Sequence, residues 1–384
     1  MRNRRAMLIA VAAVATASCG SADTATPRLN VTYMVDTTHR DKNEIFKLWR
    51  DYLDARTYTY EPKPQWSAAE QKLWPIFDLA MPQVYANDDE YRRTYATVFD
   101  ISPASTTDSS EYFIRTLFTR PQLGASPERS FIIRVYATRE DGRWVLANAL
   151  PRLTKSWKRT AFGSITYVHP PEHRVDTARA TRAIAFTDSL VKEFGAPPLK
   201  PITYYLARTP EEAFAIGGIE LYIPGSRARV VVADYLVFSG VPSIGEFYAH
   251  ELVHLTLGAT LAELQAPQLL DEALALWLGG GREMTWPQIR DELATEMRRD
   301  PSWTLERLLE EQPETFLYRN TAAAALLVIA HERGGVSMLK EALRSQPTRG
   351  GFDYIGGVMH ATKMSRAEVE AAFRRLVTDP VAKE

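Results

Sequence analysis

The chain has 384 residues, 45% hydrophobic and 24% charged, which is enough for two or three globular domains with cores of their own. Lys and Arg total 46, Asp and Glu total 47, and the formal net charge is −1. This balance argues against a nucleic-acid-binding or polybasic membrane surface, and we expect no nucleic-acid partner.

The N-terminal residues have the pattern of an export signal. Arginines near the N-terminus precede an apolar run at 6–15, which is too short to span a bilayer. Ala17 and Ser18 then lead to Cys19, the only cysteine, so no internal disulfide can form. The arrangement resembles a bacterial lipoprotein signal, with Thr16 where Leu is usual.

By that resemblance, residues 1–18 are a signal peptide, Cys19 becomes the lipidated first residue, and 19–35 form a tether. Acyl chains add about 0.8 kcal/mol of membrane affinity per buried CH₂. We therefore expect an exported protein held at a membrane, periplasmic or on the cell surface. Gly20, not Asp, follows the cysteine, which favours the outer membrane in a Gram-negative cell. An ordinary signal peptide cleaved nearby is the alternative.

Residues 36–170 are expected to form an N-terminal α+β domain that begins with helices. Apolar residues recur at helical spacing over 41–55. Ser67 and Glu70 form a capping box for a second helix, and a third is expected over 90–98.

The pattern then changes to the period of two that is typical of strands, and Asp141-Gly142 marks a hairpin turn. The expected strands cover 112–118, 130–138, 143–150, 157–160 and Ile165–His169. Helices followed by a curved antiparallel sheet resemble the cone-shaped fold of nuclear transport factor 2-like domains.

Pro170-Pro171 marks the expected start of a second domain over 171–384, mostly helical with a small sheet. Its first elements are expected to be a helix at Thr177–Phe194, a strand at Ile202–Leu206, a short helix at 209–214 and a strand at 229–232. The fold class of the whole chain is therefore α+β.

Residues 250–254 read His-Glu-Leu-Val-His, an HExxH sequence typical of zinc hydrolase helices. Ser243 and Glu246 form a capping box ahead of it and Gly258 is a natural stop, so we expect a helix over 243–258. Residues four apart lie about 40° apart around a helix, so His250 and His254 project from the same face. Two imidazoles placed in this way can bind one metal ion.

A catalytic zinc needs a third protein ligand and an open position for water. Leu257 and Thr260 stand where the three-histidine metzincin pattern requires Gly and His, which excludes that pattern. Two glutamates remain, Glu263 in the loop that follows and Glu272 near the start of an apolar helix from Gln268. A buried carboxylate on such a helix needs a partner, and a metal ion provides one.

The HELVH sequence, the spacer and the nine residues from Asp271 resemble the gluzincin zinc metallopeptidases, which include thermolysin and aminopeptidase N. The resemblance implies His250, His254 and Glu272 as ligands of one zinc ion per chain and Glu251 as general base. Asp271 stands where the aminopeptidase branch generally has Asn, and no Gly-x-Met-Glu-Asn sequence is present. Aminopeptidase activity is therefore not implied.

The same resemblance implies a mechanism for hydrolysing peptide bonds. Zinc lowers the pKa of bound water from about 15.7 towards 7, and Glu251 passes the proton of the attacking water to the leaving amine. Gluzincins of the aminopeptidase type have a tyrosine at the start of a later helix, and Tyr318 occupies a similar place before the apolar run 322–330. Such a donor to the oxyanion contributes about 3 kcal/mol.

Two functional hypotheses follow. The first is a zinc-dependent peptidase that acts on peptides or proteins outside the cytoplasm. The second is a catalytically silent binding or assembly lipoprotein on a metallopeptidase fold. The complete set of His250, His254, Glu251 and Glu272 favours the first, because a chain that does no catalysis has no physical need of all four.

Overall fold

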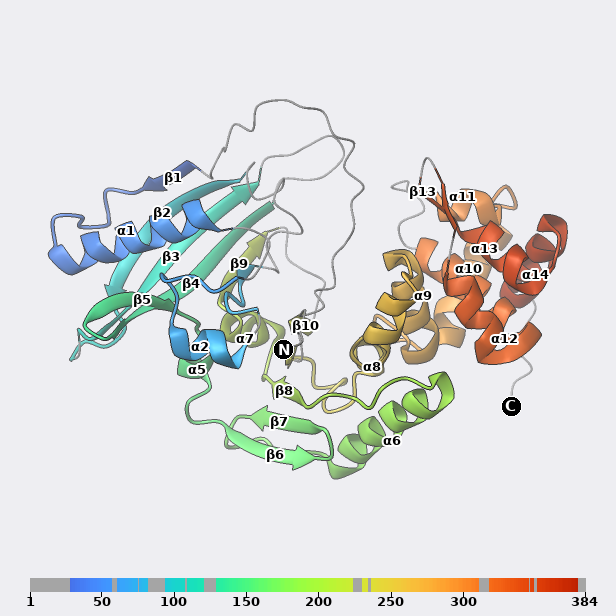
Figure 1. The fold of residues 1–384 in the computed structure, drawn as a ribbon, viewed down its shortest axis with the longest axis horizontal. Helices are drawn as coiled ribbons and strands as arrows, with labels where there is room; N and C mark the ends of the chain where they lie inside the picture. Colours follow the sequence, from blue (N-terminus) through green and yellow to red (C-terminus); the bar gives the residue numbers. More distant parts are fainter. Residues whose placement is uncertain are drawn as a thin grey trace, which may run out of the picture. The chain divides into compact units, whose positions relative to one another are not determined.

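The computed structural model describes residues 28–56, 61–74, 76–81, 94–107, 109–120, 129–223, 230–233, 236–310, 318–344, 346–348 and 351–378. The expected signal peptide and Cys19 lie outside these residues. The described residues form two compact units (Figure 1). The sheet unit comprises those within Cys19–Asp176 and Pro201–Glu246, and the helical unit comprises Thr177–Lys200 and those within Phe247–Glu384.

The main sheet of the sheet unit has the strand order β1-β2-β3-β4-β5, with β9 also paired to β4. β1 pairs parallel with β2, and the other pairs are antiparallel. Asp141 and Gly142 have φ of 50° and 80° between β4 and β5, which confirms the expected hairpin turn. The strands are β1 (Arg28–Val31), β2 (Tyr95–Pro103), β3 (Glu111–Arg120), β4 (Arg129–Glu140), β5 (Arg143–Ala147) and β9 (Ile219–Ile223).

The helices α1 (Arg40–Ala55) and α2 (Ala68–Leu73) confirm two of the expected helices. The apolar face of α1 contributes Trp49 to the core of the main sheet, where its indole N–H donates to the Thr116 hydroxyl at 2.9 Å. Figure 1 shows α1 lying along this sheet. Glu70 does not complete the expected capping box, because its carboxylate accepts from the backbone and side chain of Asn148 instead.

The expected third helix over 90–98 is wrong in its described part. Residues from Tyr95 onward form β2, whose Ala96 and Val98 point into the core while Tyr95 is exposed. Pairing with strands on both sides outweighs the local helical preference. Residues 28–31, expected within the tether, form β1 because β2 provides the hydrogen-bonding partner.

The second sheet of this unit has the order β10-β11-β8-β7-β6. The strands are β6 (Lys158–Phe162), β7 (Ile165–His169), β8 (Ile202–Leu206), β10 (Val230–Ala233) and β11 (Leu236–Ser239). Two short helices connect this sheet to the main sheet along the chain: α5 (Leu150–Leu153) lies between β5 and β6, and α7 (Pro210–Ile216) between β8 and β9. β7 and β8 pair in parallel, so residues 201–246 belong with the sheet unit. This grouping differs from the expected division at residue 171, and the assignment of functional domains stays a prediction.

The helical unit contains α6 (Thr177–Phe194), α8 (Ala249–Glu263), α9 (Gln268–Gly279), α10 (Trp286–Arg299), α11 (Leu305–Leu309), α12 (Arg319–Leu343), α13 (Tyr354–Thr362) and α14 (Arg366–Thr378). A small hairpin of β12 (Gln346–Thr348) and β13 (Gly351–Asp353) precedes α13. The expected α+β class, with small sheets and a helical C-terminal region, is confirmed. The nuclear transport factor 2-like topology stays a prediction.

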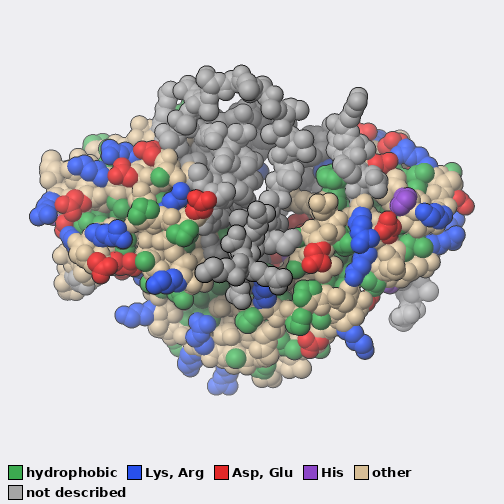
Figure 2. All heavy atoms as spheres, in the orientation of Figure 1, with side chains coloured by type: hydrophobic (Ala, Val, Ile, Leu, Met, Phe, Trp, Pro, Cys, Tyr) green, Lys and Arg blue, Asp and Glu red, His purple; other side chains and the backbone are tan. Residues whose placement is uncertain are grey.

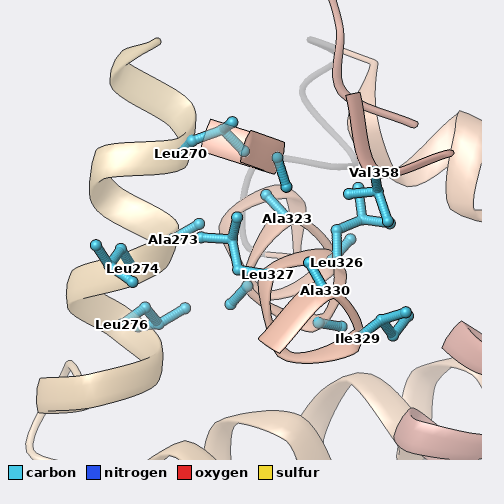
Figure 3. Packing of buried hydrophobic residues seen from close by; sticks show 14 of the residues in the cluster. Leu270, Ala273, Leu274, Leu276, Ala323, Leu326, Leu327, Ile329, Ala330 and Val358 are labelled. Atoms are coloured by element: carbon cyan, nitrogen blue, oxygen red, sulfur yellow. The ribbon is translucent and has the colours of Figure 1, made fainter. Parts of the chain in front are cut away.

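The core of the helical unit is centred on α9 and α12. Leu274 of α9 and Ala323, Leu326 and Leu327 of α12 are fully buried (Figure 3). The small alanines at 322–325 let neighbouring helices approach α12 closely. Within the described residues, α12 is the one helix that is long and apolar enough to cross a membrane. Its apolar residues are buried among other helices, however, as is typical of the core helix of a globular unit.

On the face shown in Figure 2, basic and acidic side chains are interspersed over the described surface. This agrees with the near balance of 46 basic and 47 acidic residues in the chain.

Candidate metal centre

The histidines of the HExxH sequence lie in the first two turns of α8. The helix begins at Ala249, with Tyr248 as N-cap, and continues through Gly258 to Glu263. The expected start at Ser243 and stop at Gly258 are therefore wrong. A glycine inside a helix costs only about 1 kcal/mol, which the burial of neighbouring leucines outweighs.

The expected capping box fails because Glu246 has other partners. Its buried carboxylate accepts from the backbone N–H of Asp176 and lies against Nε2 of His173, each at 2.9 Å. All three residues belong to the sheet unit. Glu246 therefore stabilises the segment ahead of α8 rather than the first turn of the helix.

His250, His254 and Glu272 converge on one point, as the sequence predicted. The two Nε2 atoms are 3.3 Å apart, and Oε2 of Glu272 lies 3.6 Å from that of His250 and 3.9 Å from that of His254. Glu263, the other candidate, is exposed at the end of α8. The cluster of three is the one that could hold a metal ion among the described residues.

Each imidazole is anchored through its other nitrogen. Nδ1 of His250 lies 2.7 Å from the carbonyl oxygen of Gly280, and Nδ1 of His254 lies 2.7 Å from Oδ1 of Asp271. Both partners accept hydrogen bonds, so each Nδ1 carries a proton and donates it. When neutral, each ring presents the lone pair of Nε2 to the cluster, with the orientation that metal-ligating histidines have.

The three atoms fit a tetrahedral zinc ion. Two lone pairs and a carboxylate oxygen would repel one another unless a cation lies between them. Zn–N and Zn–O distances of about 2.0–2.2 Å at tetrahedral angles place ligand atoms about 3.3–3.6 Å apart, close to the separations found here. Two imidazoles and one carboxylate leave a fourth position for water or substrate, as catalytic zinc sites do.

The charged groups around the cluster favour a positive charge within it. Burial alone would lower the pKa of His254, but the hydrogen bond and charge of Asp271, together with Glu272 and Glu251, raise it to about 9. The imidazoles, His250 foremost, lower the pKa of Glu272 despite its partial burial. Before a metal binds, a proton on an imidazole supplies the positive charge that this site requires.

Glu251 lies between the two histidines in sequence and is half-buried. Burial raises the pKa of its carboxyl group, and the positive charge of His250 and His254 acts in the opposite direction. Glu251 thus places a carboxyl group beside His250 and His254 with reduced contact with water, and its role as general base stays a prediction.

Glu272 reaches the cluster because α9 is fixed on its opposite side. Leu270, Ala273 and Leu274 are buried in the helical core, and Figure 3 shows leucines of α9 directed toward α12. The side chain of Glu272 is 39% exposed, so the cluster is open to solvent on that side. Glu272 is thus fixed in position by the buried face of α9 while its own side chain stays accessible to solvent.

Tyr318 lies where the sequence predicted, as the N-cap of α12, half-buried against the helical core. Within the described part of the chain, no hydrogen bond or ring contact joins its phenol to His250, His254 or Glu272. Its role as oxyanion donor stays a prediction.

Three contributors to the site were not predicted, namely Tyr248, Asp271 as a hydrogen-bond acceptor and the Gly280 carbonyl. The Tyr248 ring stacks on His250, with centroids 5.9 Å apart and planes at 25°. Burial, followed by the charges of Glu251 and Glu272, raises the pKa of Tyr248. The signals in the sequence were an acid directly before Glu272 and three consecutive glycines after it.

No protein-family model matches the chain, and no curated protein matches it. Among solved structures, one match is a mutant M1 zinc metallopeptidase from Deinococcus radiodurans bound to a Tyr-Ser-Ala substrate. The match has 12% sequence identity and a TM-score of 0.33, and it covers 76% of this chain. The chain spans 65% of that protein, less than two thirds of its length. The interpretation of this site as a metal centre therefore rests on the residues of this chain.

Proposed function

We propose that this protein is a zinc-dependent peptidase of the gluzincin type, with a peptide or protein as substrate. The observation that carries the proposal is the convergence of Nε2 of His250, Nε2 of His254 and Oε2 of Glu272, with both Nδ1 atoms anchored by acceptors. We propose these three residues as the ligands of one zinc ion per chain.

When bound, zinc would supply Lewis-acid chemistry, polarising a carbonyl group and lowering the pKa of water towards 7. Glu251 takes the proton of the attacking water and delivers it to the leaving amine. Asp271 and Gly280 hold the imidazoles in fixed orientations during the reaction. Tyr318 is proposed as a hydrogen-bond donor to the developing oxyanion.

The decisive experiment replaces Glu251 with Gln. The variant should bind one zinc ion per chain with unchanged affinity but hydrolyse peptides about 10²–10⁴-fold more slowly, because the positioned base is lost. Glu263→Gln is the matched control, since it makes the same substitution at an exposed position of the same helix. Metal content is measured by atomic spectroscopy, and hydrolysis with a proteome-derived peptide library, with and without a chelator.

The outcomes separate the two hypotheses. Normal turnover in Glu251→Gln would show that Glu251 is not the base. Full zinc occupancy of the natural chain without cleavage of any library peptide would favour the silent binding or assembly protein. The cleaved sequences would also define the substrate class and distinguish endopeptidase from exopeptidase action.

We also propose that Cys19 is lipidated and holds the exported protein at a membrane. The support is the sequence pattern of the N-terminal residues, which lie outside the described part of the chain. Cys19→Ala should abolish incorporation of a labelled fatty acid and move the protein from the membrane to the soluble fraction. Equal membrane association of the variant would contradict the proposal.

A further inference from the structure

The end of α9 forms an unusual turn beside the metal centre. Gly281 and Met284 exchange two backbone hydrogen bonds, of 3.0 and 2.8 Å, across Arg282 and Glu283. Arg282 and Glu283 have φ of 52° and 61°, left-handed conformations that non-glycine residues seldom adopt. Backbone strain of this kind persists only where the surrounding structure enforces it, and it is frequent at functional sites.

Two glycines of this turn, Gly279 and Gly280, admit no side chain. A Cβ at Gly279 would lie 2.5 Å from the backbone nitrogen of His250, and one at Gly280 would lie 2.3 Å from the carbonyl oxygen of Met284. Gly280 also has φ of 74° and ψ of −164°, a conformation restricted in practice to glycine. The turn therefore lies directly against the backbone of α8 at the first histidine.

This close approach brings the Gly280 carbonyl to 2.7 Å from Nδ1 of His250. Tyr248 covers the ring face of the same imidazole. Because Nδ1 of His250 donates its proton to the Gly280 carbonyl, the nitrogen that faces His254 and Glu272 is Nε2.

We infer that the glycine turn, residues 279–284, is a positioning element for the metal centre. It fixes the Nδ1-protonated tautomer and the orientation of His250, and thereby sets the affinity for zinc. The inference rests on the proposed function in that it assumes a metal bound by His250, His254 and Glu272. Gly280 acts through His250 and is not itself a ligand.

The test compares Gly280→Ala with Gly335→Ala. Gly335 lies at the kink of α12 with φ of 64° and ψ of −159°, nearly the same backbone conformation, and a Cβ there meets no atom within 4 Å. Both variants suffer the same kind of backbone strain, but only Gly280→Ala disturbs the carbonyl at His250. Gly258→Ala, in open space on α8, controls for substitution in the metal-binding helix.

Zinc affinity is measured by competition with a chromophoric chelator, and ligand geometry by the visible spectrum of the cobalt-substituted protein. We expect Gly280→Ala to bind zinc about 10–100-fold more weakly, with an altered cobalt spectrum, as when other hydrogen-bond partners of ligands are lost. Gly335→Ala and Gly258→Ala should keep the affinity and spectrum of the natural chain.

A second measurement needs no variant. Long-range ¹H–¹⁵N spectra of the natural zinc-loaded protein should show His250 protonated at Nδ1, and a proton at Nε2 instead would overturn the inference even if Gly280→Ala fails to fold. Zinc affinity of Gly280→Ala equal to that of the natural chain would also overturn it, while leaving the proposed function intact. Absence of zinc binding by the natural chain would overturn the proposed function, and the inference with it.

Discussion

At the scale of single residues, the hydrogen bond from Nδ1 of His254 to Asp271 decides which nitrogen faces the cluster. Asp271 belongs to the first turn of α9, directly before Glu272, so one turn of helix supplies both a proposed ligand and the acceptor that orients another. A change at Asp271 should therefore act on metal binding without removing a ligand.

We expect Asp271→Ala to weaken zinc binding by about 10–100-fold, because His254 loses the acceptor that holds its ring. Asp271→Asn should have a smaller effect, since its amide oxygen can still accept from Nδ1. Asp291→Ala, which removes a mostly exposed carboxylate from α10, is the control and should leave affinity unchanged. Chelator competition measures all three, and undiminished affinity in Asp271→Ala would contradict the role assigned to Asp271.

The three proposed ligands could be identified from the sequence, but the groups that hydrogen-bond to them could not, for a physical reason. His250 and His254 share a helix face whatever the rest of the fold does, because four residues make about one helical turn. The Gly280 carbonyl reaches His250 only through the packing of α9 against α8 and a turn with positive φ. Every residue has a backbone carbonyl, so no residue type in the sequence identifies the one that accepts this hydrogen bond.

At the scale of elements, the start of α8 shows how tertiary partners override a local pattern. Ser243 and Glu246 have capping-box spacing, yet Glu246 binds Asp176 and His173, while the phenols of Tyr167 and Tyr204 donate to the carbonyls of Glu246 and Gly245. Each of these partners is more than 40 residues away along the chain, so local spacing could not reveal them.

Removing the Glu246 carboxylate should destabilise the sheet unit. In Glu246→Ala, the N–H of Asp176 loses its acceptor at a partly exposed position, and the net loss of such a hydrogen bond costs about 0.5–1.5 kcal/mol of unfolding free energy. Glu246→Gln keeps one acceptor oxygen and should lose less. Glu61→Ala, at an exposed position of the same unit, is the control and should leave stability nearly unchanged. Stability is measured by equilibrium urea denaturation, and equal stability of Glu246→Ala and Glu61→Ala would refute the expectation.

At the scale of the whole molecule, the periodicity of apolar residues predicted the helices and strands better than the order of segments along the chain predicted their grouping into units. The runs of period two became β3, β4 and β5, and the helical pattern at 177–194 became α6 with the expected bounds. The grouping of residues 201–246 with the sheet unit could not be predicted in this way, because the parallel pairing of β8 with β7 joins segments on either side of α6. Such pairing depends on contacts distant in sequence, which local patterns do not encode.

The division into two units makes a prediction about metal removal. His250, His254 and Glu272 all belong to the helical unit, where zinc would join α8 to α9. A ligand that binds only the folded state stabilises it by about 2.7 kcal/mol at a free concentration of 100 times Kd. Chelation should therefore increase hydrogen exchange in α8 and α9 and leave β2 to β5 of the sheet unit unchanged.

Hydrogen exchange followed by mass spectrometry, with and without zinc, measures this effect segment by segment. His250→Ala is the control for metal bound elsewhere, and its exchange should not respond to zinc. The comparison is informative because the core of α9 and α12 is apolar and complete without a metal, so the helical unit should stay folded when zinc is removed. Equal loss of protection in the main sheet would show that zinc acts on the chain as a whole, contrary to a site contained within the helical unit.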